Sequence, residues 1–183
     1  MWYPPVVTVA PVAEVVTIAD VRSQTRIDAD DAASLTRLTS LIGVAGEHLE
    51  GYCGTAMTTR TVRVRCDSFA DFERLPFGPV QSITSIGYVD TAGADQVLDP
   101  SAYEVRVDLL EASIAQPFAT TWPTVRPGSR ITIIAVIGYA AVPRVIQQAA
   151  LLLIASMFEN RENEAHPDWT MVDVLLCNAR LGA

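Results

Sequence analysis

Few side chains in this sequence could do chemistry, and those few are scattered along the chain. Catalytic and metal sites need nucleophiles, bases or ligands at a defined spacing. The chain contains no G-x-S-x-G, H-E-x-x-H, G-x-G-x-x-G, P-loop or EF-hand pattern. The remaining candidates are two histidines, three cysteines and two acidic clusters: His48, His166, Cys53, Cys66, Cys177, Asp28/Asp30/Asp31 and Glu159/Glu162/Glu164.

None of these candidates has the pattern of a site. The histidines fall in different predicted elements, and the cysteines include no C-x-x-C pair. The acidic clusters lack the glycine and the spacing of a calcium loop. We interpret the histidines as surface or boundary residues, the cysteines as small buried hydrophobic residues, and the acidic clusters as helix caps and solvated side chains. The sequence therefore predicts no catalytic residue, no metal and no cofactor.

The charged residues exclude further classes of protein. The formal net charge is −8, and all 13 basic residues are arginine. The absence of lysine removes Schiff-base chemistry and the phosphate-binding lysine of a P-loop. Because residues 1–57, 58–142 and 143–183 each contain more acidic than basic residues, none of these segments has the overall positive charge of a nucleic-acid-binding domain. Arg63 and Arg65 would share one exposed strand face, where they could pair with acidic residues or form a phosphate-binding patch.

Helical patterns occupy the first part of the chain. Thr17 followed by Asp20 resembles a capping box and predicts a short helix over 17–26. From Asp30, apolar residues recur every three or four positions, which predicts an amphipathic helix of about 24 residues that Gly54 ends. This apolar stripe comprises Leu35, Leu38, Ile42, Ala45, Leu49 and Tyr52.

Between residues 58 and 142 the period of the pattern changes to two, which is typical of strands. Strands are predicted at 61–66, 103–107 and 130–139, and a hairpin over 80–98. Residues 117–128 contain three prolines and cannot be regular structure. We therefore expect an antiparallel β unit inserted between helices.

Two more helices are predicted after this unit. The segment from Pro143 to Asn160 is apolar nearly all round, so it must be buried on most sides, in part by another chain. The segment from Trp169 to Leu181 is amphipathic again. Its periodicity agrees equally well with docking on a partner and with packing on its own core.

Together these patterns predict an α+β fold. Its helical body comprises residues 17–57 and 143–183, with the β unit at 58–142 inserted, and residues 1–16 form an extended N-terminal arm. Because this arm contains three prolines and no basic residue, it is not a signal peptide. No apolar run approaches the ~20 residues that span a bilayer. We expect a soluble, intracellular protein that does not contact a membrane.

Three segments in this order are similar to one known family. They are DDAASLTRLTSLIGVAGEHLEGYCGTAM (30–57), LPFGPVQSITSIGYVDTAGADQVLDPSAYEV (75–105) and GYAAVPRVIQQAALLLIASMFENRE (138–162). The chain resembles the head–tail connector, or adaptor, proteins of tailed bacteriophages and gene transfer agents. The resemblance implies a structural protein of the particle neck, assembled in the bacterial cytoplasm, that forms a twelvefold ring beneath the portal and continues the DNA exit channel.

The resemblance also implies partners and contact residues. The partners would be other copies of the chain, the portal, and a stopper or tail-terminator protein, while DNA passes through without specific binding. The C-terminal segment would contact the portal through Trp169, Val172, Leu175, Leu176, Arg180 and Leu181. The helical core and part of the subunit contact would be formed by Leu35, Leu38, Ile42, Leu49, Ile146, Leu153 and Met157. The alternatives are a tail-completion or stopper protein of the same assembly and a small enzyme of unknown type.

Overall fold

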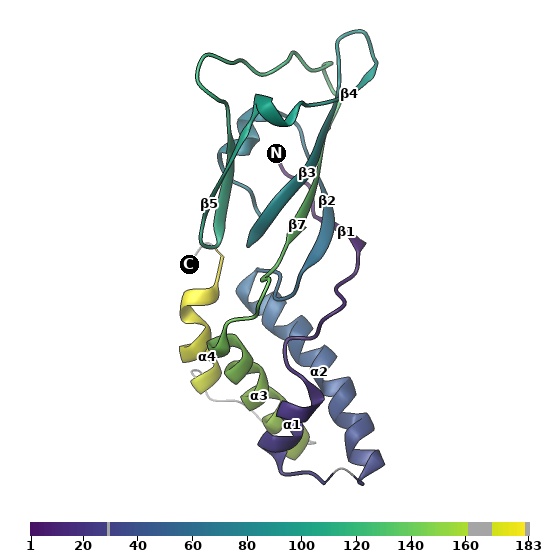
Figure 1. Ribbon diagram of the computed structural model, residues 1–183, viewed down its shortest axis with the longest axis vertical. Coiled ribbons are helices and arrows are strands. Elements are labelled where there is room, and N and C mark those ends of the chain that lie inside the picture. The colour runs from purple at the N-terminus through teal and green to yellow at the C-terminus, as the bar shows by residue number, and fades with distance from the viewer. Residues whose placement is uncertain (29, 161–169, 182–183) are drawn as a thin grey trace. The chain divides into compact units, whose positions relative to one another are not determined.

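The computed structural model describes residues 1–28, 30–160 and 170–181, and the chain divides into two compact units. Residues 1–12 and 59–140 form the first, which we call the sheet unit. Residues 13–58 and 141–183 are assigned to the second, the helical unit. Figure 1 shows the strands in one unit and the four labelled helices in the other. The α+β class predicted from the sequence is confirmed.

The sheet unit is built on a five-stranded antiparallel sheet with the order β1-β2-β7-β3-β4. Its strands are β1 (Val6–Val9), β2 (Arg60–Cys66), β7 (Ile131–Ile137), β3 (Val80–Val89) and β4 (Asp95–Val97). The central strand β7 pairs with β2 on one side and with β3 on the other. Its alternate residues Ile131, Ile133 and Ala135 are fully buried, because successive side chains of a strand point to opposite faces.

Two strands were not expected from the sequence. Residues 6–9, in the predicted extended arm, form β1 and pair with β2 at the edge of the sheet, a place that tolerates the flanking Pro4, Pro5 and Pro11. The second unexpected strand is β6 (Glu111–Ala115), which pairs with the predicted strand β5 (Glu104–Asp108) in a separate hairpin. Its turn holds Leu109 at a φ of 56°, a conformation that a sequence pattern would have assigned to glycine or asparagine.

The helical unit contains the predicted helices with their predicted caps. They are α1 (Ile18–Thr25), α2 (Ala32–Cys53), α3 (Arg144–Glu159) and α4 (Met171–Leu176). Thr17 and Asp20 form the capping box of α1, and Asp31 caps α2 by accepting a hydrogen bond from the Ser34 amide. Gly54 ends α2 at a φ of 65°, which costs glycine little because it has no Cβ.

The core of the helical unit lies where α2 and α3 pack together, with α1 against both and α4 against α3. Leu38, Ile42 and Leu49 of α2 are buried there, as are Ile146 and Ile154 of α3. Within the described residues, no helix is both long and apolar enough to cross a membrane.

Candidate functional site

The described residues of the helical unit line a largely apolar groove. It has a volume of about 490 Å³. Leu152 and Leu153 of α3 line it together with Val172 of α4, and His48 and Tyr52 of α2 add polar atoms. The groove therefore lies among the three helices that carry most of the predicted contact residues.

The short helix α4 lines this groove, and polar contacts occur at both of its ends. At its start, Thr170 Oγ1 donates to Asp173 Oδ2 at 2.6 Å, and the Asp173 amide donates back to Thr170 Oγ1 at 3.3 Å. Beyond its end, the Leu181 amide donates to the Cys53 carbonyl of α2 at 2.8 Å. The guanidinium of Arg180 lies over the Tyr52 ring, 5.0 Å from its centroid.

Asp173 and Tyr52 add a titratable contact between α4 and α2. Hydrogen bonds from the Thr170 side chain and the Tyr52 hydroxyl lower the pKa of Asp173 to about 2. The same carboxylate raises the pKa of Tyr52, since its hydroxyl must stay protonated to donate. Above acidic pH, Asp173 is therefore a charged acceptor that holds α4 near α2.

The predicted portal-contact residues do not share one environment. Leu176 is only 1% exposed and belongs to the core of the helical unit, so in this conformation it cannot contact a partner. Val172, Leu175 and Leu181 are half-buried, whereas Arg180 is exposed. Trp169 lies outside the described residues.

The exposed apolar side chains of α4 were missing from the predicted contact set. Met171 is 64% exposed and Val174 is 47% exposed. Apolar residues lie on both sides of this short helix, so periodicity alone does not say which side packs on α3. Leu176 is buried in the core, which fixes how α4 is rotated about its axis. In this rotation Val174 is exposed to solvent, and Met171 is exposed at the groove.

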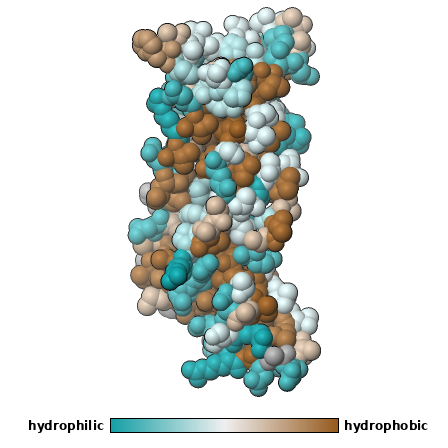
Figure 2. All heavy atoms as spheres, in the orientation of Figure 1, coloured by the Kyte–Doolittle hydropathy of each residue, from teal (hydrophilic) through white to brown (hydrophobic). Residues whose placement is uncertain are grey.

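The predicted core and oligomerisation residues divide in a similar way. Leu38, Ile42, Leu49 and Ile146 are buried inside the chain, while Leu35, Leu153 and Met157 are half-buried. In α3 the buried residues are Ile146, Ala149, Ala150 and Ile154. Apolar side chains therefore remain partly uncovered on a helix that was expected to be buried on most sides, in part by another chain. Figure 2 shows apolar side chains reaching the surface in several places, interspersed with polar ones.

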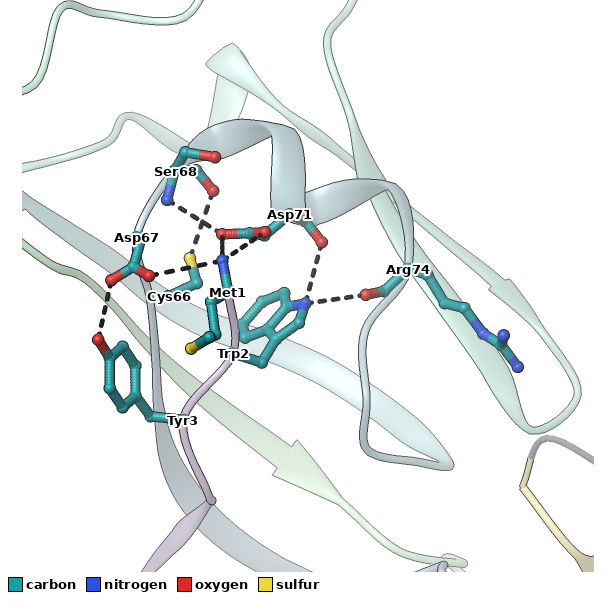
Figure 3. A network of polar contacts seen from close by, with 8 residues as sticks. All are labelled: Met1, Trp2, Tyr3, Cys66, Asp67, Ser68, Asp71 and Arg74. Carbon is teal, nitrogen blue, oxygen red and sulfur yellow. Dashed lines mark hydrogen bonds and ion pairs between the residues drawn. The ribbon is translucent and has the colours of Figure 1, made fainter.

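The sheet unit has its own polar network, which fixes the first residues of the chain (Figure 3). The amino group of Met1 lies 2.7 Å from Asp71 Oδ2 and 3.6 Å from Asp67 Oδ2. The Trp2 indole N–H contacts the carbonyls of Asp71 and Arg74, each at 3.1 Å, and the Tyr3 hydroxyl donates to Asp67 Oδ1 at 3.1 Å. This network ties the chain before β1 to the segment after β2.

The chemical candidates remain apart in the structure. Across residues 1–28, 30–160 and 170–181, no three histidine, cysteine or acidic side chains come together as metal ligands would. Burial raises the pKa of the Cys66 thiol to about 12, which removes its thiolate at neutral pH. His48 stacks on Tyr52 with ring centroids 6.5 Å apart. His166 lies outside the described residues.

Comparison with known proteins gives matches among solved structures only. No family model matches the chain, and no curated protein matches it. A chain in the neck of an empty gene transfer agent particle, computed with C6 symmetry, has a TM-score of 0.80 and 24% identity, and the match covers 99% of both chains.

Two further structures extend this likeness. A chain in the virion of a native gene transfer agent particle has a TM-score of 0.75 and 24% identity, with 99% of both chains covered. A chain in the neck of a native particle, computed with C12 symmetry, has a TM-score of 0.66 and 23% identity, covering 96% of this chain and 98% of the other. Over almost its full length, the protein therefore has the fold of a chain from a gene transfer agent particle neck, as the sequence resemblance implied.

Proposed function

We propose that this chain is a structural subunit of the neck of a phage or phage-like particle. Copies of it form a ring under the portal, join the head to the tail and continue the DNA exit channel. The observation that carries the proposal is the full-length fold match to particle-neck structures at a TM-score up to 0.80. A match over 99% of both chains includes the helices, the sheet and their connections, not one common motif.

The surface of the helical unit supports a role in assembly. Val44, Val145, Met171 and Val174 are exposed aliphatic side chains on three of its helices, and the groove beside α4 is lined by further apolar groups. Single exposed apolar residues are ordinary. Several of them on a unit that also has an apolar groove, which Met171 lines, suit a protein that buries more surface in a complex. The matched necks were computed with C6 and C12 symmetry, so a ring of twelve copies fits this proposal.

In this ring the C-terminal segment contacts the portal. The contact residues are Trp169, Val172, Leu175, Leu176, Arg180 and Leu181, as the family resemblance implies, together with the exposed Met171 and Val174. Because Leu176 is buried against its own unit, its participation requires α4 to move away from α3. The conformation in which α4 packs on α3 is then the conformation before assembly. In the assembled ring, α4 exchanges its contact with α3 for a contact with the portal.

The net charge supports free passage of DNA through the ring. With a formal charge of −8 for each chain, twelve copies carry a charge of about −96, and this net negative charge opposes tight retention of a duplex. The ring therefore guides DNA without gripping its bases.

The direct test is a truncation that removes residues 168–183. Particles that carry it should contain full heads and separate tails, because the portal contact is lost. A double variant, Met171→Asp with Val174→Asp, should give the same defect if the exposed side of α4 takes part, since a few apolar anchors carry most of an interface. The control is Asn178→Asp, which adds negative charge at an exposed position.

If particles with the truncated chain joined tails as often as wild-type particles do, the proposed portal contact would be wrong. Purified protein that binds tail components but no portal would identify a stopper or tail-completion protein. Turnover of a small substrate by purified protein would favour an enzyme.

A further inference from the structure

The outer face of the sheet in the sheet unit concentrates positive charge. In β2, Val62 and Val64 point into the core, while Arg63 and Arg65 point outward and are exposed. Arg65 lies opposite Thr132 in β7. Arg130, two residues earlier, continues the same face because side chains alternate along a strand. We call Arg63, Arg65 and Arg130 the arginine patch.

The arginine patch lines a defined hollow of the surface. A shallow pocket of about 180 Å³ is bounded by its three arginines together with Tyr3, Pro4 and Val6. The Arg130 guanidinium lies 3.9 Å from the centroid of the Tyr3 ring, which fixes its orientation. The arginines therefore converge on one place, although two come from β2 and the third directly precedes β7.

These three arginines have no acidic partner in the part of the chain that the structure describes. Other arginines of the same unit are paired: Arg74 Nη2 lies 2.6 Å from Glu111 and Arg106 Nη2 lies 3.7 Å from Glu104. Like charges held close together repel each other unless an anion is present.

The two carboxylates after β2 already have other partners (Figure 3). Asp71 accepts from the Met1 amino group and from the Ser68 amide. Asp67 accepts from the Tyr3 hydroxyl and also lies 3.6 Å from the Met1 amino group. The single positive charge of the Met1 amino group offsets one of these two carboxylates, and among the described residues neither carboxylate forms an ion pair with the arginine patch.

The neighbouring groups of this face include hydroxyls as well as the apolar side chains of Val6 and Ile134, which both lie opposite Arg63. Thr132 lies opposite Arg65. Ser85 lies opposite Ile134, which in turn lies opposite Arg63. Arginine guanidinium groups and the hydroxyls of serine, threonine and tyrosine are the side-chain donors that proteins direct at DNA phosphates.

From this arrangement we infer that the arginine patch binds the phosphodiester backbone of duplex DNA without reading its sequence. The inference rests on the proposed function, which places DNA inside a ring of these chains. A band of arginines on an otherwise acidic ring would retain the duplex weakly and reversibly. An acidic protein surface could also neutralise the patch. Three arginines without an acidic partner and the hydroxyls near them favour phosphate, because these are the side-chain donors that proteins direct at the DNA backbone.

The test is the binding of purified full-length chain to a short fluorescent duplex, measured by anisotropy over a series of NaCl concentrations. Each phosphate contact contributes about 0.9 to the slope of log K against log salt concentration. The double variant Arg63→Gln with Arg65→Gln should reduce this slope by about 2 and weaken binding at low salt. Arg63→Lys with Arg65→Lys should retain most of the slope, since it retains the charge.

The matched control is Arg74→Gln with Arg106→Gln. It removes the same charge from the same unit at positions that already have acidic partners, and it should leave the slope unchanged. Circular dichroism of each variant checks that the fold is retained.

Three results would overturn the inference. One is the absence of duplex binding by the wild-type chain at the lowest salt concentration. Another is an equal loss in the control, which would reflect overall charge. The third is a competition result in which polyglutamate displaces the labelled duplex as well as unlabelled DNA does, at equal concentrations of negative charge. This result would identify a site for an acidic protein. A patch variant that joins heads to tails normally but no longer binds DNA would support the inference and leave the proposed function intact.

Discussion

The two units of this protein leave apolar residues uncovered in different places. In the sheet unit, the inward residues of β2 and β7, such as Val64 and Ile133, are fully buried, and exposed apolar residues lie on an edge strand, a turn and a loop, as Val6, Leu109 and Phe118 do. In the helical unit, Ile154 of α3 is fully buried, but its neighbour Leu153 is only half-buried and lines a groove. The central strands of the sheet unit therefore complete their core within the chain. Helix α3 leaves apolar surface beside its own core, which a neighbouring copy would cover in the proposed ring.

The sharpest test of this difference uses the adjacent residues Ile154 and Leu153. Ile154→Asp should unfold the isolated chain, because it buries a charge without a partner, a change that can cost more than about 4 kcal/mol. Leu153→Asp should leave the isolated chain folded and abolish ring formation, since its charge can reach solvent until a partner covers it. Thermal unfolding of the isolated chain measures the effect on folding. The mass of the assembled particle neck measures the effect on ring formation.

The comparison between units would be wrong if Leu153→Asp unfolded the chain as completely as Ile154→Asp. It would also be wrong if Leu153→Asp formed normal necks. Ile133→Asp in β7 provides the reference for the sheet unit and should resemble Ile154→Asp.

A smaller effect is expected at the end of α2. Gly54 has a φ of 65°, a left-handed conformation in which a Cβ costs about 1 kcal/mol. Gly54→Ala should therefore lower the free energy of unfolding by about 1 kcal/mol, as urea denaturation would measure. Gly51→Ala is the control, because Gly51 lies inside α2 with no neighbouring side chain within 4 Å of the position that a Cβ would take, and it should stabilise the helix slightly. Equal effects of the two substitutions would contradict the role of Gly54.

The smallest effect concerns the docking of α4 at low pH. The pKa of Asp173 is lowered to about 2 from an ordinary value of 3.8. A carboxyl group with a lowered pKa in the docked state stabilises that state above its ordinary pKa, and this stabilisation is lost as the pH falls toward 2. The protection factors of the α4 amides, which compare the observed hydrogen exchange with the intrinsic rate at the same pH, should therefore fall between about pH 4 and pH 2 in the wild-type chain. Asp173→Asn should exchange faster at neutral pH and lose this pH dependence, whereas an unchanged profile in that variant would exclude Asp173 as the cause.

Local signals explain which elements the sequence predicts. The Thr17–Asp20 capping box, the apolar stripe that includes Leu38, and the stop at Gly54 are formed by residues close in the sequence. All three are present in the structure. The alternation of Val62, Arg63 and Val64 likewise predicts both β2 and its exposed arginine face.

Contacts between distant residues explain what the sequence does not predict. The short β1 is defined by its pairing with β2, more than 50 residues away. The prolines on both sides of it obscure the strand pattern in the sequence. The turn of the β5–β6 hairpin uses Leu109 at positive φ, which carries no glycine signal. Arg130 joins Arg63 and Arg65 only through the register of β2 with β7. The phase of α4 depends on which of its two apolar sides packs on α3.

The most direct test of the proposed function is a cryo-EM reconstruction of the neck of particles made in cells that express this chain. We predict a ring of twelve copies between the portal and the tail, with the C-terminal segment of each copy against the portal. A neck whose density is fully explained by other proteins, in particles that join heads to tails without this chain, would contradict the proposal.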